Sequence, residues 1–232
     1  MKTKTGNLIS LLIIIGFVLF FSDSCKKDNS NNNPPSGGTV TDIDGNVYQT
    51  VIIGTQTWMA SNLKTTKYRN GTQIPNVADS VQWSTLTTGA YCNNNNDPNT
   101  VALYGRFYNY YAVTDSNNIA PAGWHVPSDA EWTTLVTYLG SGAGGKLKST
   151  GTTYWNSPNT GATNSTGFSG LPAGDRSYTG LFHYVGMYGC WWSTGASSAT
   201  NAWEYVTEYN SSGVTRLAYS MGLGLSVRCV KN

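Results

Sequence analysis

The stretch GWHVPSDAEWTTL, residues 123–135, carries the clearest fold signal in the chain. Ser128 is a favoured N-cap residue and Glu131 follows three positions later, which together make the pattern of a capping box. Apolar residues then recur at the spacing of one helical face: Trp132, Leu135, Val136 and Leu139. Because Gly140 follows as a stop signal, the stretch predicts a helix that begins after Ser128 and ends at Gly140.

The carboxylates of this stretch, Asp129 and Glu131, raise the question of catalysis. Helix initiation accounts for both, because Glu131 completes the capping box and Asp129 suits the positive end of the helix dipole. His125 lies just before them in an expected strand, where a lone histidine is usually structural. The only other histidine is His183, and two histidines alone do not make a metal site. We therefore expect no catalytic residue, no metal and no cofactor.

The composition around this helix favours a loop-rich β protein. Charged residues make up only 11% of the 232 residues, whereas glycines number 26 and tyrosines 15. The net charge is +2 without a basic cluster in the body of the chain, which argues against nucleic-acid binding. A β-hairpin, two short helices (the first an aromatic one within 103–115) and several antiparallel strands follow in order, which predicts the α+β class.

Turn signals place the expected hairpins. Asp44-Gly45 separates two β-rich runs, Gly54 turns the chain again, and Ser212-Gly213 divides a later pair of strands. The final run LSVRCV, residues 225–230, is expected to place alternate apolar residues on one face: Leu225, Val227 and Cys229.

An acidic turn near the first hairpin has the early ligand positions of a calcium loop: Asp42, Asp44 and Asn46. Val47 stands where such a loop needs a glycine, and Ile53 stands where it needs a bidentate glutamate. We therefore interpret the segment as a turn.

The N-terminus is typical of an exported protein. Lys2 and Lys4 precede an apolar run over residues 8–21, which is shorter than a membrane span needs. Ser24 and Cys25 follow and resemble a bacterial lipoprotein processing site, which predicts a signal peptide over 1–25 and acylation of Cys25. The anchor would hold the protein at the outer membrane, exposed at the cell surface. The alternatives are an ordinary signal peptide with an incidental cysteine, or an uncleaved anchor.

Residues 26–38, KKDNSNNNPPSGG, contain no apolar residue to bury and predict a flexible polar tether. The folded domain is then expected over residues 39–232, which is an ordinary size for one domain.

Several blocks of this region share a family resemblance. They are DIDGNVYQTVIIGTQTWMASNL, YGRFYNYYAV, GWHVPSDAEWTTL, GGKLKSTG, GFSGLPAGDR, CWWST and GLSVRCV. In this order they resemble the Fibrobacter succinogenes major paralogous domain, over nearly all of residues 39–232. Two of the blocks are also similar to the sulfatase-modifying-factor superfamily, the formylglycine-generating enzymes. That kinship implies a C-type-lectin-like fold, with a curled antiparallel sheet, two short helices, long loops and neighbouring termini.

The chemistry of those enzymes does not follow from the resemblance. They bind copper and substrate thiol through a pair of cysteines near the C-terminus, and here Cys190 has no nearby partner in sequence. By analogy with lectin-like folds, a disulfide between Cys92 and Cys229 is expected. The alternative is three reduced thiols, Cys92, Cys190 and Cys229, that pack as small hydrophobes.

A surface-anchored, non-catalytic binding module for an extracellular carbohydrate or protein is the function we expect. Aromatic loop residues suit sugar stacking, and the candidates are Trp155, Tyr184 and Tyr188. We expect Trp191 and Trp192 to be core residues, whereas Trp155 fits either place. The alternatives are an enzyme related to the formylglycine-generating group and a purely structural envelope protein.

Overall fold

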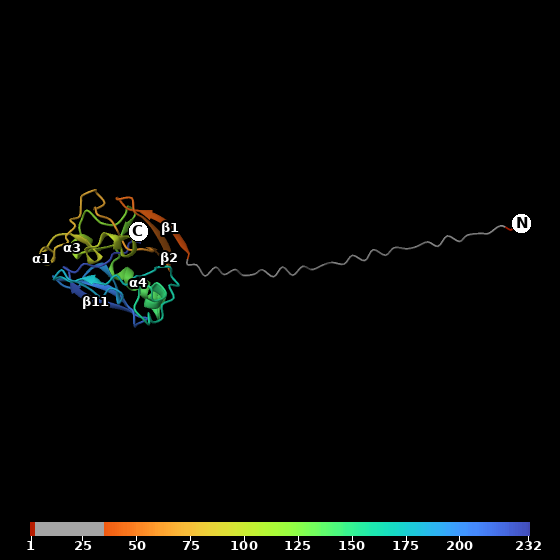
Figure 1. Cartoon of the computed structure of the whole chain (residues 1–232). Coiled ribbons are helices and arrows are strands. Elements are labelled where there is room, and N and C mark those ends of the chain that lie inside the picture. Colours follow the sequence, from red (N-terminus) through yellow and green to blue (C-terminus); the bar gives the residue numbers. More distant parts are fainter. Residues whose placement is uncertain (3–34) are drawn as a thin grey trace. The chain divides into compact units, whose positions relative to one another are not determined.

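The computed structural model describes Met1, Lys2 and residues 35–232, and the latter form an α+β domain of antiparallel sheets and short helices (Figure 1). The expected signal peptide, Cys25 and most of the expected tether lie outside the described residues. Strand β1 already begins at Ser36, so ordered structure starts before the boundary expected at residue 39. A polar, glycine-containing segment can do this because ladder hydrogen bonds need only the backbone. No helix of the described residues is long and apolar enough to cross a membrane.

The largest sheet joins the two ends of the domain. Its order is β1-β2-β3-β12-β6, and the bounds are β1 (Ser36–Thr41), β2 (Val47–Ile53), β3 (Gln56–Met59), β12 (Val230–Lys231) and β6 (Trp124–His125). The turn from β1 to β2 is the one expected at Asp44-Gly45. The Asp42 carboxylate accepts hydrogen bonds from the backbone N–H groups of Asp44 and Asn46, at 3.0 and 2.9 Å. Gly45 lies at φ 84°, a conformation that favours glycine.

A second antiparallel sheet, of order β11-β10-β9, forms the opposite side of the domain (Figure 1). Its strands are β9 (Tyr188–Ala196), β10 (Asn201–Glu208) and β11 (Val214–Ser220). The β10–β11 pair is the expected hairpin across Ser212-Gly213. Two small sheets complete the β structure: β4 (Tyr91–Asn93) with β5 (Arg106–Tyr108), and β7 (Asp175–Arg176) with β8 (Phe182–His183).

The helices are short, and α4 (Asp129–Leu139) is the longest of those described. The others are α1 (Ser80–Ser84), α2 (Val101–Tyr104), α3 (Tyr110–Val113), α5 (Ala143–Leu147) and two 3₁₀ turns, η1 (Asn94–Asn96) and η2 (Pro98–Thr100). The aromatic helix expected within 103–115 is wrong as a single element. Strand β5 separates α2 from α3, because pairing with β4 satisfies its backbone and buries Phe107 and Tyr108.

Helix α4 starts as its sequence predicts and packs against the second sheet. Both bonds of the capping box are present, and Gly140 ends the helix at φ 64°. Trp132 stacks on Tyr205 of β10 with ring centroids 4.9 Å apart and planes 12° apart, and it also contacts Trp58 of the first sheet. Trp191 and Trp192 are buried, as expected of core residues. The apolar face of α4 therefore joins the two sheets.

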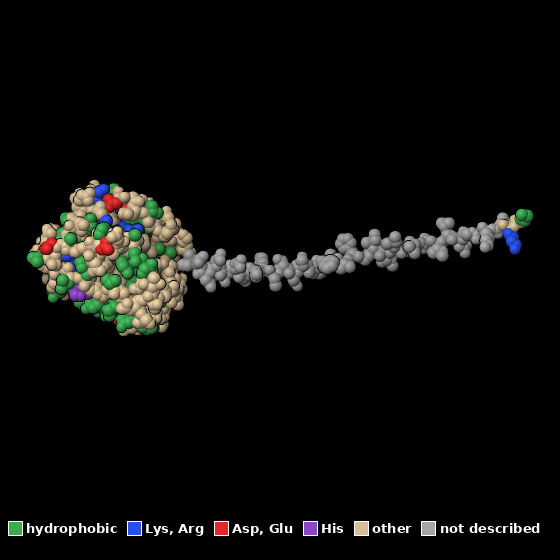
Figure 2. Space-filling view, viewed as in Figure 1, with side chains coloured by type: hydrophobic (Ala, Val, Ile, Leu, Met, Phe, Trp, Pro, Cys, Tyr) green, Lys and Arg blue, Asp and Glu red, His purple; other side chains and the backbone are tan. Residues whose placement is uncertain are grey.

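Three cations are buried without a carboxylate partner, and backbone carbonyls hold each of them. Arg228 donates to the carbonyls of Met59 and Phe168, and Arg176 donates to those of Val77 and Ala78. Lys148 Nζ donates to three carbonyls, those of Thr160, Glu208 and Ser211. Burial lowers the pKa of Arg228 to about 9 and that of Lys148 to about 8. These side chains tie long loops to the core, while Figure 2 shows an outer surface that is mostly uncharged.

The predicted disulfide is not present. Cys92, Cys190 and Cys229 are all free and buried, so the alternative of three reduced thiols describes the structure. Cys92 belongs to a small cluster with Trp83 and Phe107, whereas Cys229 belongs to the main core. The analogy with lectin-like folds predicted a disulfide between two cysteines that pack in different hydrophobic clusters. Strand β12 covers only Val230–Lys231 and not the whole run 225–230, but the alternate residues Leu225, Val227 and Cys229 lie in the main core as expected.

Candidate functional site

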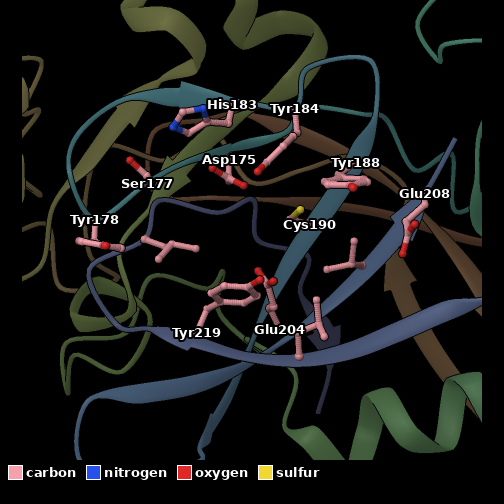
Figure 3. A pocket seen from close by; sticks show the side chains of 13 residues that line it. Asp175, Ser177, Tyr178, His183, Tyr184, Tyr188, Cys190, Glu204, Glu208 and Tyr219 are labelled. Atoms are coloured by element: carbon pink, nitrogen blue, oxygen red, sulfur yellow. The ribbon is translucent and has the colours of Figure 1, made fainter.

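A cavity of about 370 Å³ lies between the second sheet and the β7–β8 pair (Figure 3). Polar and aromatic side chains dominate its wall. The lining residues are Asp175, Ser177, Tyr178, His183, Tyr184, Tyr188, Cys190, Glu204, Val206, Glu208, Leu217, Tyr219 and Leu223. A concave site with aromatic surface and a few polar groups is typical of small-ligand binding.

One wall of the cavity comes from alternate residues of three neighbouring strands. Strand β10 contributes Glu204, Val206 and Glu208, β9 contributes Tyr188 and Cys190, and β11 contributes Leu217 and Tyr219. Successive side chains of a strand point to opposite faces of the sheet. The residues between them therefore face the other way, and Tyr205 and Trp191 indeed pack with Trp132 of α4.

The opposite wall is built on β7 and β8. Asp175 pairs with His183 across this two-stranded sheet, which puts both side chains on the same face. Gly174 precedes β7 at φ 69°, and a Cβ there would lie 2.0 Å from the carbonyl oxygen of His183. Only glycine permits this close approach, so the glycine of the sequence block GFSGLPAGDR brings Asp175 against the β8 strand.

Tyrosines line much of the cavity. Tyr184 is 48% exposed and lies against Tyr188, with ring centroids 4.8 Å apart. Tyr178 and Tyr219 also line the cavity and are also exposed. Tyr184 has φ 64°, which is uncommon for a bulky residue and marks a position worth functional scrutiny. The structure thus brings together two of the aromatic candidates, Tyr184 and Tyr188.

Two carboxyl groups in the cavity have raised pKa values. Glu204 is only 4% exposed, and its Oε2 atom has no hydrogen-bond partner. Burial, and secondarily the charge of Asp175, raise the pKa of Glu204 to about 8. Burial raises the pKa of Asp175 to about 6, although nearby His183 opposes that rise. Figure 3 shows both side chains extending into the space between the two walls.

No lysine or arginine is among the lining residues in the described part of the chain. The ammonium of Lys148 donates to the backbone carbonyl of the lining residue Glu208. Within residues 35–232 no group of three or more His, Cys, Asp or Glu side chains is arranged to hold a metal ion. The cavity is therefore acidic, apart from His183.

Trp155, the third aromatic candidate, is not on the cavity wall. It is 1% exposed, and its indole N–H donates to Ser149 Oγ and to the Gly170 carbonyl at 3.1 Å. The expectation that the Trp155 ring could stack on a ligand is wrong, because the ring is buried. Loop composition alone could not reveal it, because the indole is covered by residues distant in sequence. Its neighbour Asn156 donates a backbone N–H to the Gly186 carbonyl at 2.8 Å and so supports the loop that carries Tyr184.

The carboxylates at the start of α4 are fully engaged. Glu131 accepts hydrogen bonds from the N–H and Oγ of Ser128, both at 2.8 Å, and contacts His125 Nε2 at 2.8 Å. Asp129 forms a bidentate ion pair with Arg216, at 2.6 and 2.8 Å, and accepts a bond from Tyr205. The Ser128 hydroxyl donates to the Glu131 carboxylate and accepts from the Glu131 N–H, which is the capping-box arrangement.

The pKa values at the start of α4 reflect these partners. The hydrogen bonds from Arg216 lower the pKa of Asp129. Burial on its own would raise the pKa of Glu131, but hydrogen bonds from Ser128 and His125 outweigh it and lower the value. Both groups are therefore ionised and bonded at neutral pH, as helix initiation requires.

Sequence reasoning missed the acidic residues of the cavity: Asp175, Glu204 and Glu208. The signal was available for two of them. The predicted strand AWEYVTEY, residues 202–209, places Glu204, Val206 and Glu208 on one face by its period of two. An acidic residue with no basic neighbour on a strand face is unusual in a core. Asp175 offered no such signal, because only the fold brings it to this face.

Comparison with known proteins supplies a family. A search of curated proteins and a search of solved structures each returned no match. The Fibrobacter succinogenes major domain family matches residues 51–231, which is more than half of the chain. The match includes the capped helix and every residue of the cavity wall. The chain therefore belongs to the Fibrobacter succinogenes major domain family.

Proposed function

We propose that this domain is a non-catalytic binding module for an extracellular carbohydrate, and that the cavity is its binding site. The observation that carries the proposal is the cavity wall, in which four tyrosines accompany three carboxyl groups. Tyrosine rings offer flat faces for stacking on sugars, and carboxyl groups accept hydrogen bonds from hydroxyls. The exposed fractions of Tyr184 and Tyr219, both 48%, leave these rings accessible.

The finer fold assignment is part of the same proposal. A C-type-lectin-like fold, with kinship to the sulfatase-modifying-factor superfamily, is supported by the capped helix α4 and by the C-terminal strand β12 beside β3. These are the two sequence blocks on which the resemblance depends. An experimental structure that superposes α4, β12 and the curled second sheet on a lectin-like domain would establish the kinship, and a different order of these elements would contradict it.

Binding is favoured over catalysis of the formylglycine-generating type. Those enzymes use thiolates, and burial raises the pKa of the three thiols within residues 35–232, that of Cys92 to about 12. Protonated, buried thiols are poor nucleophiles and poor metal ligands. A purely structural envelope protein is the remaining alternative, and it would have no use for an accessible acidic cavity.

The cellular location of the protein is also a proposal. We infer that the chain is anchored by acylated Cys25 at the outer membrane and faces the cell exterior. Acyl chains contribute about 0.8 kcal/mol per buried CH₂, so several chains hold a soluble domain at a membrane. Cells fed a clickable fatty acid should label the wild-type chain and not Cys25→Ser. Labelling and membrane retention of the serine variant would exclude the lipoprotein assignment.

A glycan panel tests the binding function. The full-length chain, purified in detergent, should bind at least one saccharide class, and Tyr184→Ala should weaken that binding about tenfold or more with little change in melting temperature. Tyr138, an exposed tyrosine of α4, provides the matched control, and Tyr138→Ala should bind normally. Binding that is indifferent to Tyr184→Ala would remove the cavity as the site. Cleavage of a bound glycan would show that Asp175 and Glu204 act in acid–base chemistry instead.

A further inference from the structure

The cavity gathers acidic side chains without a lysine or arginine among its described lining residues. Asp175, Glu204 and Glu208 line it, and among the described lining residues the only basic side chain is His183. Glu204 is 4% exposed, yet its Oε2 lacks any hydrogen-bond partner. Buried carboxyl oxygens are usually bonded, because leaving one unsatisfied costs roughly 1–3 kcal/mol. Since Glu204 lines the cavity, a ligand bound there can supply the hydrogen-bond donor that this carboxyl group lacks.

We propose that the saccharide unit held in this cavity carries a free ammonium group, as an unacetylated amino sugar does. The inference rests on the proposed function and names its ligand class. The ammonium would lie between Asp175 and Glu204 and donate to the unpartnered Glu204 oxygen. Its charge would also face the tyrosine rings that close the cavity, above all Tyr184 and Tyr188.

A cation satisfies this site better than a hydroxyl does. A hydroxyl can donate one hydrogen bond to Glu204, but it does not favour the ionised forms of Asp175 and Glu204. An ammonium donates three hydrogen bonds and brings a charge opposite to both carboxylates. Tyrosine faces attract cations through their quadrupole, with about 0.5–2 kcal/mol for each good contact. The combination of aromatic rings and carboxylates therefore selects an ammonium over a neutral group of the same size.

The charged groups around Glu204 come from each element that packs on it. Strand β7 contributes Asp175, β8 contributes His183, and β10 itself contributes Glu208. On the neighbouring strands Glu204 faces the uncharged residues Leu217 and Trp192. Arg216 of β11 pairs with Asp129 on the other face of the sheet, so it is not available to the cavity.

Proton release accompanies binding if this assignment is right. Asp175 and Glu204 hold protons more tightly than ordinary carboxyls, with pKa values of about 6 and about 8. A bound cation favours their ionised forms and expels those protons. Affinity for a permanently charged ammonium should therefore rise from pH 5 to pH 8. A neutral sugar would show no such rise.

The experiment compares oligosaccharides whose amino groups are either free or acetylated, so that only the free series can carry ammonium charge. Calorimetric titration at pH 7 of the full-length chain uses chitosan oligosaccharides and fully N-acetylated oligosaccharides of the same length. The deacetylated series should bind at least about tenfold more tightly, with protons released into the buffer. Glu204→Gln and Asp175→Asn should each reduce that preference, whereas Glu131→Gln, at the start of α4, should keep it. Circular dichroism confirms that each variant is folded.

Each outcome separates this inference from the proposed function. Equal affinity for the two series, or a preference that survives both Glu204→Gln and Asp175→Asn, overturns the ammonium assignment and leaves carbohydrate binding intact. If no saccharide binds, NMR titration with cyclohexylammonium and cyclohexanol is decisive. Binding of the amine alone, dependent on Glu204, would retain the ammonium site and discard the carbohydrate. Failure of both probes would overturn both proposals.

Discussion

The start of α4 holds two carboxylates and the cavity holds two carboxyl groups with raised pKa values, and the protein treats the two pairs in opposite ways. Asp129 and Glu131 are bonded to Arg216, Ser128 and His125, and their pKa values are lowered. Glu204 is buried and Asp175 is half-buried, and burial raises the pKa values of both. The first pair stabilises the fold at neutral pH, whereas the second opposes it.

The difference teaches where function is to be sought. A carboxylate whose oxygens already accept hydrogen bonds from a helix cap or an arginine has no acceptor left for a ligand. This holds even where its sequence context suggests a catalytic role. A buried carboxylate whose oxygen lacks a hydrogen-bond donor lowers the stability of the fold. Such residues are retained where a ligand or a reaction uses the carboxylate. The two pairs should also respond to pH with opposite signs. Stability from Asp129 and Glu131 is lost as pH falls, while the cost of Asp175 and Glu204 grows as pH rises.

The largest effect is expected from a change that removes support for the cavity and leaves the start of α4 unchanged. Trp155→Ala should lower the free energy of unfolding by about 3–5 kcal/mol, because it empties a fully buried site. Chemical denaturation measures the loss. Tyr154→Ala, at the exposed neighbouring residue, should change stability by no more than about 0.5 kcal/mol. A similarly small effect of Trp155→Ala would contradict its burial and return it to the list of ligand-binding candidates.

The second prediction concerns the pH dependence of the cavity. In the folded chain Glu204 has a pKa of about 8, against an ordinary value of 4.5, so the folded state binds the proton more tightly. Stability should therefore fall as pH rises from about 4.5 to about 8. The fall amounts to a few kcal/mol, since one pKa unit corresponds to about 1.4 kcal/mol. Glu204→Gln should remove most of this slope in urea melts across that range.

Glu208→Gln is the matched control for that slope, because it makes the same change four residues further along β10 at a less buried side chain. The wild-type slope should persist in this variant. A slope that Glu204→Gln leaves intact would mean that Glu204 is not the buried proton acceptor of the cavity.

The third prediction addresses the helix start. Ser128→Ala removes the hydroxyl that accepts from the Glu131 N–H and should cost about 0.5–2 kcal/mol of stability. Ligand binding in the cavity should not change, because Ser128 lies on neither of its walls. Paired denaturation and binding measurements test both statements. If Ser128→Ala lost binding at unchanged stability, the start of α4 would contribute to the binding site, and the two regions would not be independent.

The smallest effect is expected for Glu131→Gln. Glutamine also serves in a capping box, and its amide oxygen can accept from the Ser128 N–H. Stability should change by about 0.5 kcal/mol or less at neutral pH. Should Glu131→Gln abolish an activity with the melt unaltered, the carboxylate would need a functional role.

The sequence by itself determined the features that depend only on residues close together along the chain. The capping box at Ser128 and Glu131, the stop at Gly140 and the turns at Asp44-Gly45 and Ser212-Gly213 each depend on residues within a few positions of one another. The α+β class and the family followed from their order along the chain. The strand period also held the clue to Glu204 and Glu208, which lie two residues to either side of Val206 on one face.

Only the tertiary structure decided which side chains meet. Trp155 has loop composition but is covered by residues such as Gly170, and Cys92 and Cys229 pack in different clusters and stay reduced. The cavity joins β7 and β8 to β10 and β11, segments that are far apart in sequence. Burial and the neighbouring charge raise the pKa of Glu204, and neither can be read from its own strand. Long-range packing sets solvent exposure and electrostatic environment, so these properties emerge only when the whole chain is folded.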